Sequence, residues 1–311
     1  MGAMDLSNNG KLILIFIGSV LYTFSVLCNL ALLLVIAVNK SLHEPMYMLL
    51  CHLIINDLIG ISAMIPKVLS EIMSEFRYTS FLACLGQAFC LHIYGGATLF
   101  ILSVMALDRY VAICYPLRYH TILTKDIVGN LIACVWLADF TLITVLLGLM
   151  LRFPFCRTIL VNVYCDNVTL LQATCATDTS VNNIYGLFIS GVYHGIGLLC
   201  VVYSYSWIIY TCFKNKDPGA KLKAINTCGT HLLVFLIYEI TGMFTILVYR
   251  FQGSPRLLQQ LMGMLFAVVS PSLNPLIYGI KSKEIKVKLK QLFFQLPGTG
   301  GLKVQVNTVS M

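Results

Sequence analysis

The chain has 311 residues, of which 58% are hydrophobic and 11% are charged, and its formal net charge is +8. Soluble globular proteins carry about 25% charged residues, so this composition indicates a membrane protein. The basic residues lie mostly in alternate polar breaks between apolar blocks, which argues against a nucleic-acid partner.

Apolar blocks of about 20 or more residues recur along the whole chain and predict an all-α membrane protein with seven membrane-spanning helices. The first block is too long for the apolar region of a cleavable signal peptide, so we expect it to act as an uncleaved signal anchor. No internal repeat and no second domain is visible in the sequence. The predicted spans are 12–38, 46–70, 83–114, 127–150, 183–212, 222–249 and 257–280.

The segment Lys281–Phe294, which follows the last span, alternates basic and apolar residues and is too short to cross a membrane. This pattern predicts a short amphipathic helix on the anionic lipid of the inner leaflet. We therefore expect one domain over residues 1–294, a seven-helix bundle with its juxtamembrane helix, and a disordered cytoplasmic tail over residues 295–311.

The distribution of positive charge predicts the orientation in the membrane. The loops and terminus on one side hold 14 of the 21 lysines and arginines, and those on the other side hold 7. The positive-inside rule places the richer side in the cytoplasm. We therefore expect a multi-pass plasma-membrane protein with an extracellular N-terminus and a cytoplasmic C-terminus.

Four of the twelve cysteines lie on the predicted outer side, and the other eight lie in spans or on the cytoplasmic side. Four cysteines in an oxidising compartment predict two disulfides, for which three pairings are possible. Spacing alone does not choose among the pairings. The outer cysteines are Cys84, Cys156, Cys165 and Cys175.

The inner end of the third span carries an acidic and a basic residue side by side. An apolar stretch from Leu85 to Leu107 runs directly into Asp108, Arg109 and Tyr110. A cation at the end of a membrane helix can reach the water interface. The pair could be a switch with a closed and an open arrangement, or a static interfacial anchor.

Three polar residues lie in otherwise apolar spans and need partners there. Asn29, Asp57 and Asn274 could form one polar cluster across the first, second and seventh spans. The cluster could bind water or sodium, or it could be a purely structural hydrogen-bonded knot. Pro275 should loosen the last span at this level.

Residues 105–119, Met-Ala-Leu-Asp-Arg-Tyr-Val-Ala-Ile-Cys-Tyr-Pro-Leu-Arg-Tyr, resemble the third-helix signature of olfactory receptors. These are a large family of rhodopsin-like G-protein-coupled receptors. An Asp-Arg-Tyr triplet alone would indicate only the wider class, whereas the match through Tyr119 is much more specific. Further motifs extend the resemblance to nearly every span: Leu42–Tyr47, Ser204-Tyr205, Lys223–Leu232 and Pro271–Tyr278.

The resemblance implies a receptor that binds a small-molecule odorant and activates a stimulatory, olfactory-type G protein, which raises cyclic AMP. It implies that activation frees Arg109, with Tyr205 and Tyr278 as its expected partners. It implies neither a cofactor nor a metal.

The outer loop also follows the family pattern, with eight and nine residues between its successive cysteines. This resemblance implies the disulfides Cys84–Cys165 and Cys156–Cys175. The first would hold the loop over the helix bundle as a lid.

We expect the ligand pocket in the outer half of the bundle, between Cys84 and Asp108 in depth. Two adjacent glycines on the third span leave room beside its backbone. Candidate residues on the sixth span recur every three or four positions, so they share one helix face. The candidates are Leu91, His92, Gly95 and Gly96, then Ile189, Tyr193 and His194, and finally Tyr238, Glu239, Thr241, Gly242 and Thr245.

Two features depart from the family pattern. Cys28 precedes Asn29 where the family usually has glycine, and Glu239 follows Tyr238 where a small residue is usual. Glu239 falls near the middle of the membrane, where an ionised carboxylate is costly. It could be protonated and hydrogen-bonded to another helix, it could anchor a cationic odorant such as an amine, or it could pair with a basic group such as His194.

A sequon in the outer loop, Asn167-Val168-Thr169, makes Asn167 a candidate glycosylation site. The six histidines contain no pair at helical metal-binding spacing, and phosphate-binding and dinucleotide fingerprints are absent from the sequence, so we expect no enzyme. Two alternatives remain. One is a rhodopsin-like receptor for a metabolite that is not an odorant, and the other is a small-solute transporter, which would favour repeat symmetry.

Overall fold

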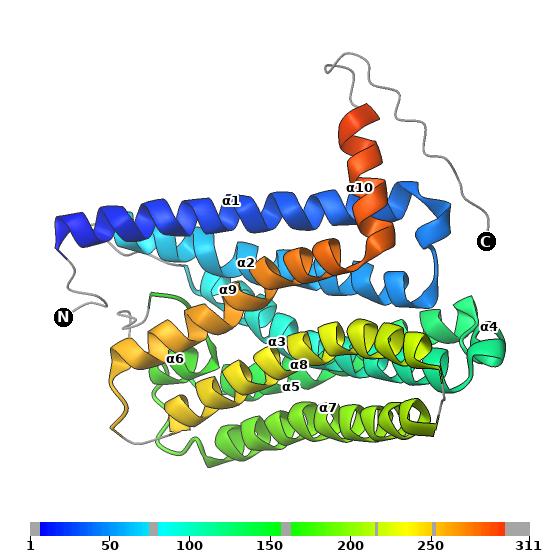
Figure 1. The fold of residues 1–311 in the computed structure, drawn as a ribbon. Coiled ribbons are helices and arrows are strands. Elements are labelled where there is room, and N and C mark those ends of the chain that lie inside the picture. The colour runs from blue at the N-terminus through cyan, green and yellow to red at the C-terminus, as the bar shows by residue number, and fades with distance from the viewer. Residues whose placement is uncertain (1–6, 75–79, 157–162, 215–216, 251–252, 296–311) are drawn as a thin grey trace.

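The computed structural model describes residues 7–74, 80–156, 163–214, 217–250 and 253–295. Seven helices in these ranges are long and apolar enough to cross a membrane. They lie side by side in one bundle, as Figure 1 shows. They are α1 (Asn8–Val38), α2 (Pro45–Met73), α3 (Phe81–Cys114), α5 (Lys125–Leu151), α7 (Ser180–Lys214), α8 (Pro218–Arg250) and α9 (Arg256–Lys281).

Five short elements complete the described chain. The 3-10 turn η1 (Lys40–Leu42) joins α1 to α2, and η2 (Pro116–Arg118) with α4 (Tyr119–Ile122) follows α3. Helix α6 (Asn167–Gln172) lies in the loop between α5 and α7, and α10 (Lys283–Gln295) follows α9.

The seven predicted spans and the all-α architecture are confirmed, and most helices begin a few residues earlier than their apolar blocks. Polar caps explain this difference, because a side-chain oxygen satisfies a backbone N–H of the first turn. Ser7 accepts from the N–H of Gly10 at the start of α1, and Ser80 accepts from that of Ala83 at the start of α3. Thr124 caps α5 in the same way.

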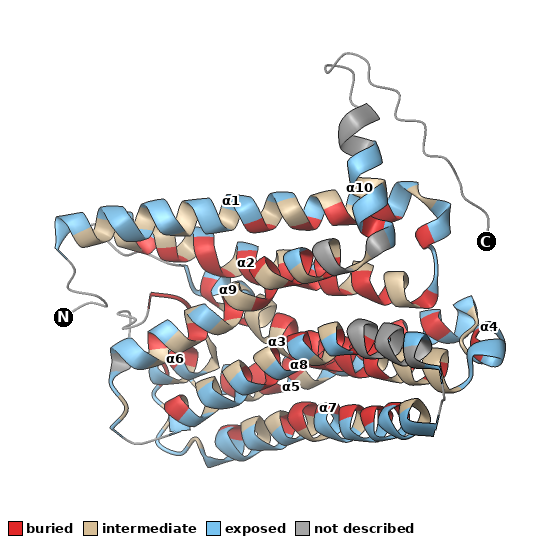
Figure 2. Ribbon diagram, in the orientation of Figure 1, coloured by how far each residue is buried: buried red, intermediate tan, exposed pale blue. Residues whose placement is uncertain are grey.

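Helix α3 is the central helix of the bundle and packs against α2, α5, α7 and α8. In the most apolar 18-residue stretch of α3, 67% of the residues are buried, compared with 28% in the corresponding stretches of α1 and α7. Figure 2 shows exposed residues along the outward sides of α1 and α7. Large apolar side chains such as Phe16 and Leu199 lie on these sides, 70% and 72% exposed, where lipid would cover them in a membrane.

Helix α10 is the short helix expected after the last span, and it leaves the bundle at an angle to α1 in Figure 1. Ile285 is fully buried, while the hydroxyl of Tyr47 on α2 donates to the Glu284 carboxylate at 2.8 Å. The apolar anchor and the polar contact together hold α10 against the end of the bundle that carries α4. Of the predicted tail, residues 296–311 lie outside the described residues.

Candidate functional site

A cavity of about 260 Å³ lies inside the end of the bundle that carries the disulfides. This volume is close to the lower end of the ~300–1,000 Å³ range of small-molecule pockets. Residues of α3, α7, α8 and α9 form most of its wall, and Tyr164 and Asp166, just before α6, line it from the loop. The lining is mostly apolar and aromatic, so the cavity suits a small, largely apolar ligand.

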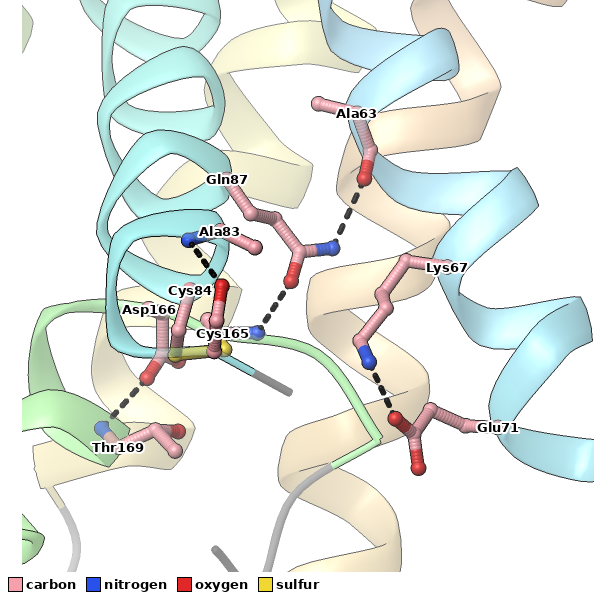
Figure 3. The surroundings of a disulfide bond; sticks show 10 residues. Ala63, Lys67, Glu71, Ala83, Cys84, Gln87, Cys165, Asp166 and Thr169 are labelled. Carbon is pink, nitrogen blue, oxygen red and sulfur yellow. Dashed lines mark hydrogen bonds and ion pairs between the residues drawn. A yellow bond between two sulfur atoms is a disulfide. The ribbon is translucent and has the colours of Figure 1, made fainter. Parts of the chain in front are cut away.

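The loop is fastened to the bundle next to the start of α3, as Figure 3 shows. A disulfide joins Cys84 of α3 to Cys165, with a distance of 5.2 Å between the two Cα atoms. Gln87, one turn further along α3, accepts from the N–H of Cys165 and donates to the carbonyl of Ala63 on α2, both at 2.8 Å. The loop is therefore tied covalently to α3 and, through one amide side chain, to α2.

A second disulfide, Cys156–Cys175, closes the loop on itself, with 5.5 Å between the Cα atoms. It lies beside an isolated β-bridge between Phe155 and Thr174. The two disulfides follow the pairing that the family resemblance implies.

Tyr164 brings the loop down to the pocket mouth. Its hydroxyl lies 2.6 Å from the hydroxyl of Tyr249 on α8. A Cβ atom at Gly263 on α9 would lie closer than 3.0 Å to the Tyr164 ring, so only glycine leaves room for it. Burial, with the nearby Asp166 carboxylate, raises the pKa of Tyr164, which keeps this phenol neutral and able to donate a hydrogen bond.

Two carboxylates lie directly behind pocket residues of α7. The hydroxyl of Tyr193 donates to Oδ1 of Asp139 on α5 at 2.6 Å, and Asp139 is fully buried. Nδ1 of His194 lies 3.0 Å from Oε1 of Glu239 on α8. Tyr193 and His194 line the pocket, whereas the two carboxylates lie outside its lining.

The space beside Gly96 is filled by protein. A Cβ atom at this position would lie closer than 3.0 Å to both Asp139 and Tyr193. The expectation that both glycines leave room for a ligand therefore needs correction at Gly96, where the room is taken by the Tyr193–Asp139 pair. At Gly95 an added Cβ would make only an ordinary contact, 3.6 Å from the ring of Phe266.

A polar cluster joins α1, α2 and α9 in the middle of the bundle. Asn274 donates to Asp57 at 2.7 Å, and the two residues are buried. Asn29 donates instead to the carbonyl of Pro271 at 2.8 Å. That carbonyl is the one that residue 275 would bond in a regular helix, and Pro275 has no N–H to offer. Asn29 therefore satisfies the backbone group that the proline leaves free, and it joins the cluster through α9 rather than through Asp57.

The far end of α3 holds the Asp108–Arg109 pair in a closed arrangement. Nη2 of Arg109 donates to Oδ2 of Asp108 at 2.7 Å, and the hydroxyl of Tyr119 donates to Oδ1 at the same distance. Asp108 is buried, where unpaired polar atoms are costly, and these two hydrogen bonds satisfy both of its oxygens. Burial and the Asp108 carboxylate raise the pKa of Tyr119, which keeps it a hydrogen-bond donor.

His231 of α8 joins α3, α7 and α8 at a level one to two turns from Asp108 along α3. Its Nε2 lies 3.0 Å from the carbonyl of Leu102 on α3, and its Nδ1 lies 3.1 Å from the hydroxyl of Tyr205 on α7. The Tyr205 hydroxyl is shared with the carbonyl of Cys228 on α8, at 2.7 Å. The hydroxyl of Tyr278 is buried without a hydrogen-bond partner in the described residues. Neither tyrosine bonds Arg109 in this arrangement.

A family model described as "Olfactory receptor" matches residues 18–296. Similar proteins include olfactory receptor 52H1 of Homo sapiens, which is 38% identical over 290 residues that cover 90% of this chain and 89% of that protein. Olfactory receptor 52D1 of Homo sapiens is 34% identical over 88% of this chain and 86% of its own length. This chain belongs to the olfactory receptor family. It is a multi-pass membrane protein and not an enzyme, as its sequence predicted.

Nine of the twelve pocket residues predicted for this olfactory receptor line the cavity. They are Leu91, His92, Gly95, Gly96, Ile189, Tyr193, His194, Gly242 and Thr245. Tyr238 and Thr241 are turned toward the protein, where their hydroxyls donate to backbone carbonyls of Gly95 and Ile237. Glu239 lies behind His194.

Several residues that shape this receptor's pocket were not among the predicted ones. Asp139 was missed, although it could have been found, because it is a lone aspartate in an apolar span, as Asp57 is. Tyr94, Tyr164 and Tyr249 carry no such signal, because aromatic residues are common in any membrane helix or loop. Only the three-dimensional structure shows that they meet around the cavity.

The first and third residues of this receptor's sequon are partly and almost fully buried. Asn167 lines the pocket and its Oδ1 is buried without a hydrogen-bond partner in the described residues. Thr169, the third residue of the sequon, is 1% exposed. Asn167 therefore stays a candidate glycosylation site, and this burial disfavours its use in the folded receptor, because a glycan needs an outward path.

Proposed function

We propose that the receptor binds an odorant in the 260 Å³ cavity and activates a stimulatory, olfactory-type G protein, which raises cyclic AMP. The observation that carries the proposal is the separation of two built sites along α3. The cavity lies near Cys84, and the Asp108–Arg109 pair lies at the other end of the same helix.

The proposed orientation of the receptor in the membrane follows from its distribution of positive charge. The segments at the Arg109 end include η1, α4 and α10, and the count of lysines and arginines favours a cytoplasmic position for them. With the N-terminus extracellular, the pocket opens outward, the loop with its two disulfides lies in an oxidising compartment, and α10 lies along inner-leaflet lipid.

Ligand binding would act by shifting a two-state equilibrium. In the closed arrangement Asp108 holds Arg109, and Tyr205 bonds to α8. If α8 moves away from α3, Tyr205 loses its bond to Cys228 and becomes free to meet Arg109, with Tyr278 as a second partner. A ligand that binds the open packing more tightly than the closed packing then favours signalling.

The test is a cyclic AMP assay with a panel of odorants, in which Arg109→Ala is compared with the wild-type receptor at equal surface expression. We expect ligand binding to persist and the signal to fall by at least about tenfold, since the arginine touches no part of the pocket. Arg118→Ala is the matched control, because Arg118 is an exposed cation in the neighbouring turn η2. Full cyclic AMP output from Arg109→Ala would refute the assignment.

One alternative within the receptor class is a receptor for a metabolite that is not an odorant. Polar metabolites added to the panel test it, because such a receptor would respond to them and to no volatile compound.

A further inference from the structure

Two consecutive pocket residues of α7 are each backed by a buried carboxylate from a different neighbouring helix. Tyr193 contacts Asp139 of α5, and His194 contacts Glu239 of α8. The first contact is an ordinary hydrogen bond, in which a phenol donates to a carboxylate. The second joins two ionisable groups, so its protons decide what His194 presents to the pocket.

The ring of His194 has one nitrogen turned to Glu239 and the other turned away. Nδ1 is buried and lies 3.0 Å from Oε1 of Glu239, at ion-pair distance but off the ideal hydrogen-bond direction. No hydrogen bond to either carboxylate oxygen or to Nδ1 is formed in the described residues. His194 lines the pocket and its Nδ1 is buried against Glu239, so Nε2 is the nitrogen that a ligand can reach.

The low dielectric of the membrane interior favours a pair with no net charge. A single uncompensated charge there is costly, and Arg250, the next cation on α8, lies eleven residues away, or about 16 Å along the helix. Neutrality requires two protons shared by Nδ1, Nε2 and the carboxylate. At least one of the two protons is on Nδ1 or Oε1, because two bare lone pairs only 3.0 Å apart would repel each other.

The second proton belongs on Nε2. If it lay on Oε2 of Glu239 instead, it would have no acceptor, because Oε2 is buried without a partner in the described residues. His194 therefore offers an Nε2–H group to the cavity, whether the pair is an ion pair or a neutral acid with a neutral ring.

Three other pocket hydroxyls already donate to backbone carbonyls. Tyr94 donates to the carbonyl of Phe266 at 3.3 Å, and Ser190 donates to that of Gly186 at 2.7 Å. Thr245 donates to the carbonyl of Thr241, also at 2.7 Å. A ligand that meets these groups finds no free donor among them, in contrast to Nε2–H of His194.

We propose that Glu239 is a positioning residue that fixes His194 as a hydrogen-bond donor, and that the pocket selects ligands with an oxygen acceptor such as a carbonyl group. The proposal rests on the proposed function only in taking this cavity as the ligand site. It differs from a counter-ion role for Glu239, in which the carboxylate would contact an amine directly. Glu239 lies behind the imidazole and outside the lining of the cavity.

The test compares ring compounds that share one skeleton: cyclohexanone, methylenecyclohexane, cyclohexanol and cyclohexylamine, each with its monomethyl and dimethyl derivatives. Binding is measured as the concentration of each probe that stabilises the purified receptor against heat. We expect each ketone to bind about tenfold more tightly than its methylene analogue, as one hydrogen bond of about 1.4 kcal/mol would give. We expect the amines to bind more weakly than the ketones.

Glu239→Gln separates positioning from simple packing. The amide of Gln can donate to Nδ1 or accept from it, so the ring is free to present either a donor or an acceptor at Nε2. With the two forms equally populated, ketones lose about twofold in affinity, while alcohols, which can accept or donate, lose none. We therefore expect the ratio of ketone to alcohol affinity to fall by about twofold, whereas a purely structural loss would weaken all probes by one common factor. His194→Phe, which keeps a ring and removes the donor, should abolish the ketone advantage over the methylene analogue.

Asp139→Asn is the matched control, since it removes the other buried carboxylate without touching His194. It should change all probes by a common factor. Tightest binding by the amines, an unchanged ketone-to-alcohol ratio in Glu239→Gln, or failure of every ketone to bind the wild-type receptor would overturn the proposal. If Glu239→Gln does not fold, the wild-type panel and His194→Phe still decide. Ketone binding without a cyclic AMP response would count against the proposed function alone.

Discussion

Replacing His231 by phenylalanine should raise the basal activity of the receptor. The phenylalanine ring can keep the stacking on Tyr205, whose ring centroid lies 6.2 Å from that of His231. It removes the two nitrogens that reach the carbonyl of Leu102 and the hydroxyl of Tyr205. Both contacts join α8 to its neighbours in the closed arrangement, and both must break if α8 moves outward.

The magnitude follows from these two hydrogen bonds. Each contributes about 0.5–1.5 kcal/mol net, so the closed packing loses about 1–3 kcal/mol relative to the open one. That corresponds to about a 5- to 150-fold change in the equilibrium constant. If ~1% of the receptor is open without ligand, the substitution raises the open fraction to between ~5% and ~60%.

The assay is ligand-free cyclic AMP output, normalised to receptor at the cell surface. His52→Phe is the matched control, because Nδ1 of His52 accepts from the indole of Trp136 at 3.2 Å and joins α2 to α5 without involving α8. Its basal output should equal that of the wild-type receptor. If His231→Phe signals no more than the wild type at equal expression, or if His52→Phe rises as much, α8 is not held by these bonds.

Two further predictions concern the loop and its sequon. Cys84→Ser opens a loop of 81 residues and Cys156→Ser opens one of 19. The chain-entropy model therefore predicts that the free energy of unfolding falls by about 4–5 kcal/mol in the first variant and by about 3 kcal/mol in the second. Cys84→Ser should unfold at the lower temperature when the purified variants are heated, and equal unfolding temperatures would contradict this. For the sequon, glycosidase treatment should leave the mobility of the receptor on gels unchanged, because Asn167 lines the pocket and Thr169 is buried. A mobility shift that is lost in Asn167→Gln would contradict this prediction. A second sequon, Asn39-Lys40-Ser41, lies between α1 and α2, and a shift lost in Asn39→Gln would place that loop outside the cell and reverse the proposed orientation.

The sequence predicted the helices well because membrane spans depend on one local property, a long run of apolar residues. It predicted Glu239 as an unusual residue for the same reason, since a carboxylate in such a run is conspicuous. It could not place the side chain relative to His194, because the two residues lie on different helices and 45 positions apart. Gly96 lines the cavity as predicted, but the sequence could not show that Tyr193 and Asp139 occupy the space at its Cβ position, because a glycine shows that room is needed and not what fills it.

The contact between Asn29 and the Pro271 carbonyl limits how this receptor can be recombined with its relatives. The carbonyl left free by Pro275 lies in α9, while the amide that satisfies it lies in α1, 242 positions earlier in the chain. A chimaera that took α1 from a protein without asparagine at this position would leave a bare carbonyl in the bilayer interior, where it has no water to bond. Exchanging α1 and α9 together would avoid that defect, so these two helices should be transferred between receptors as one unit.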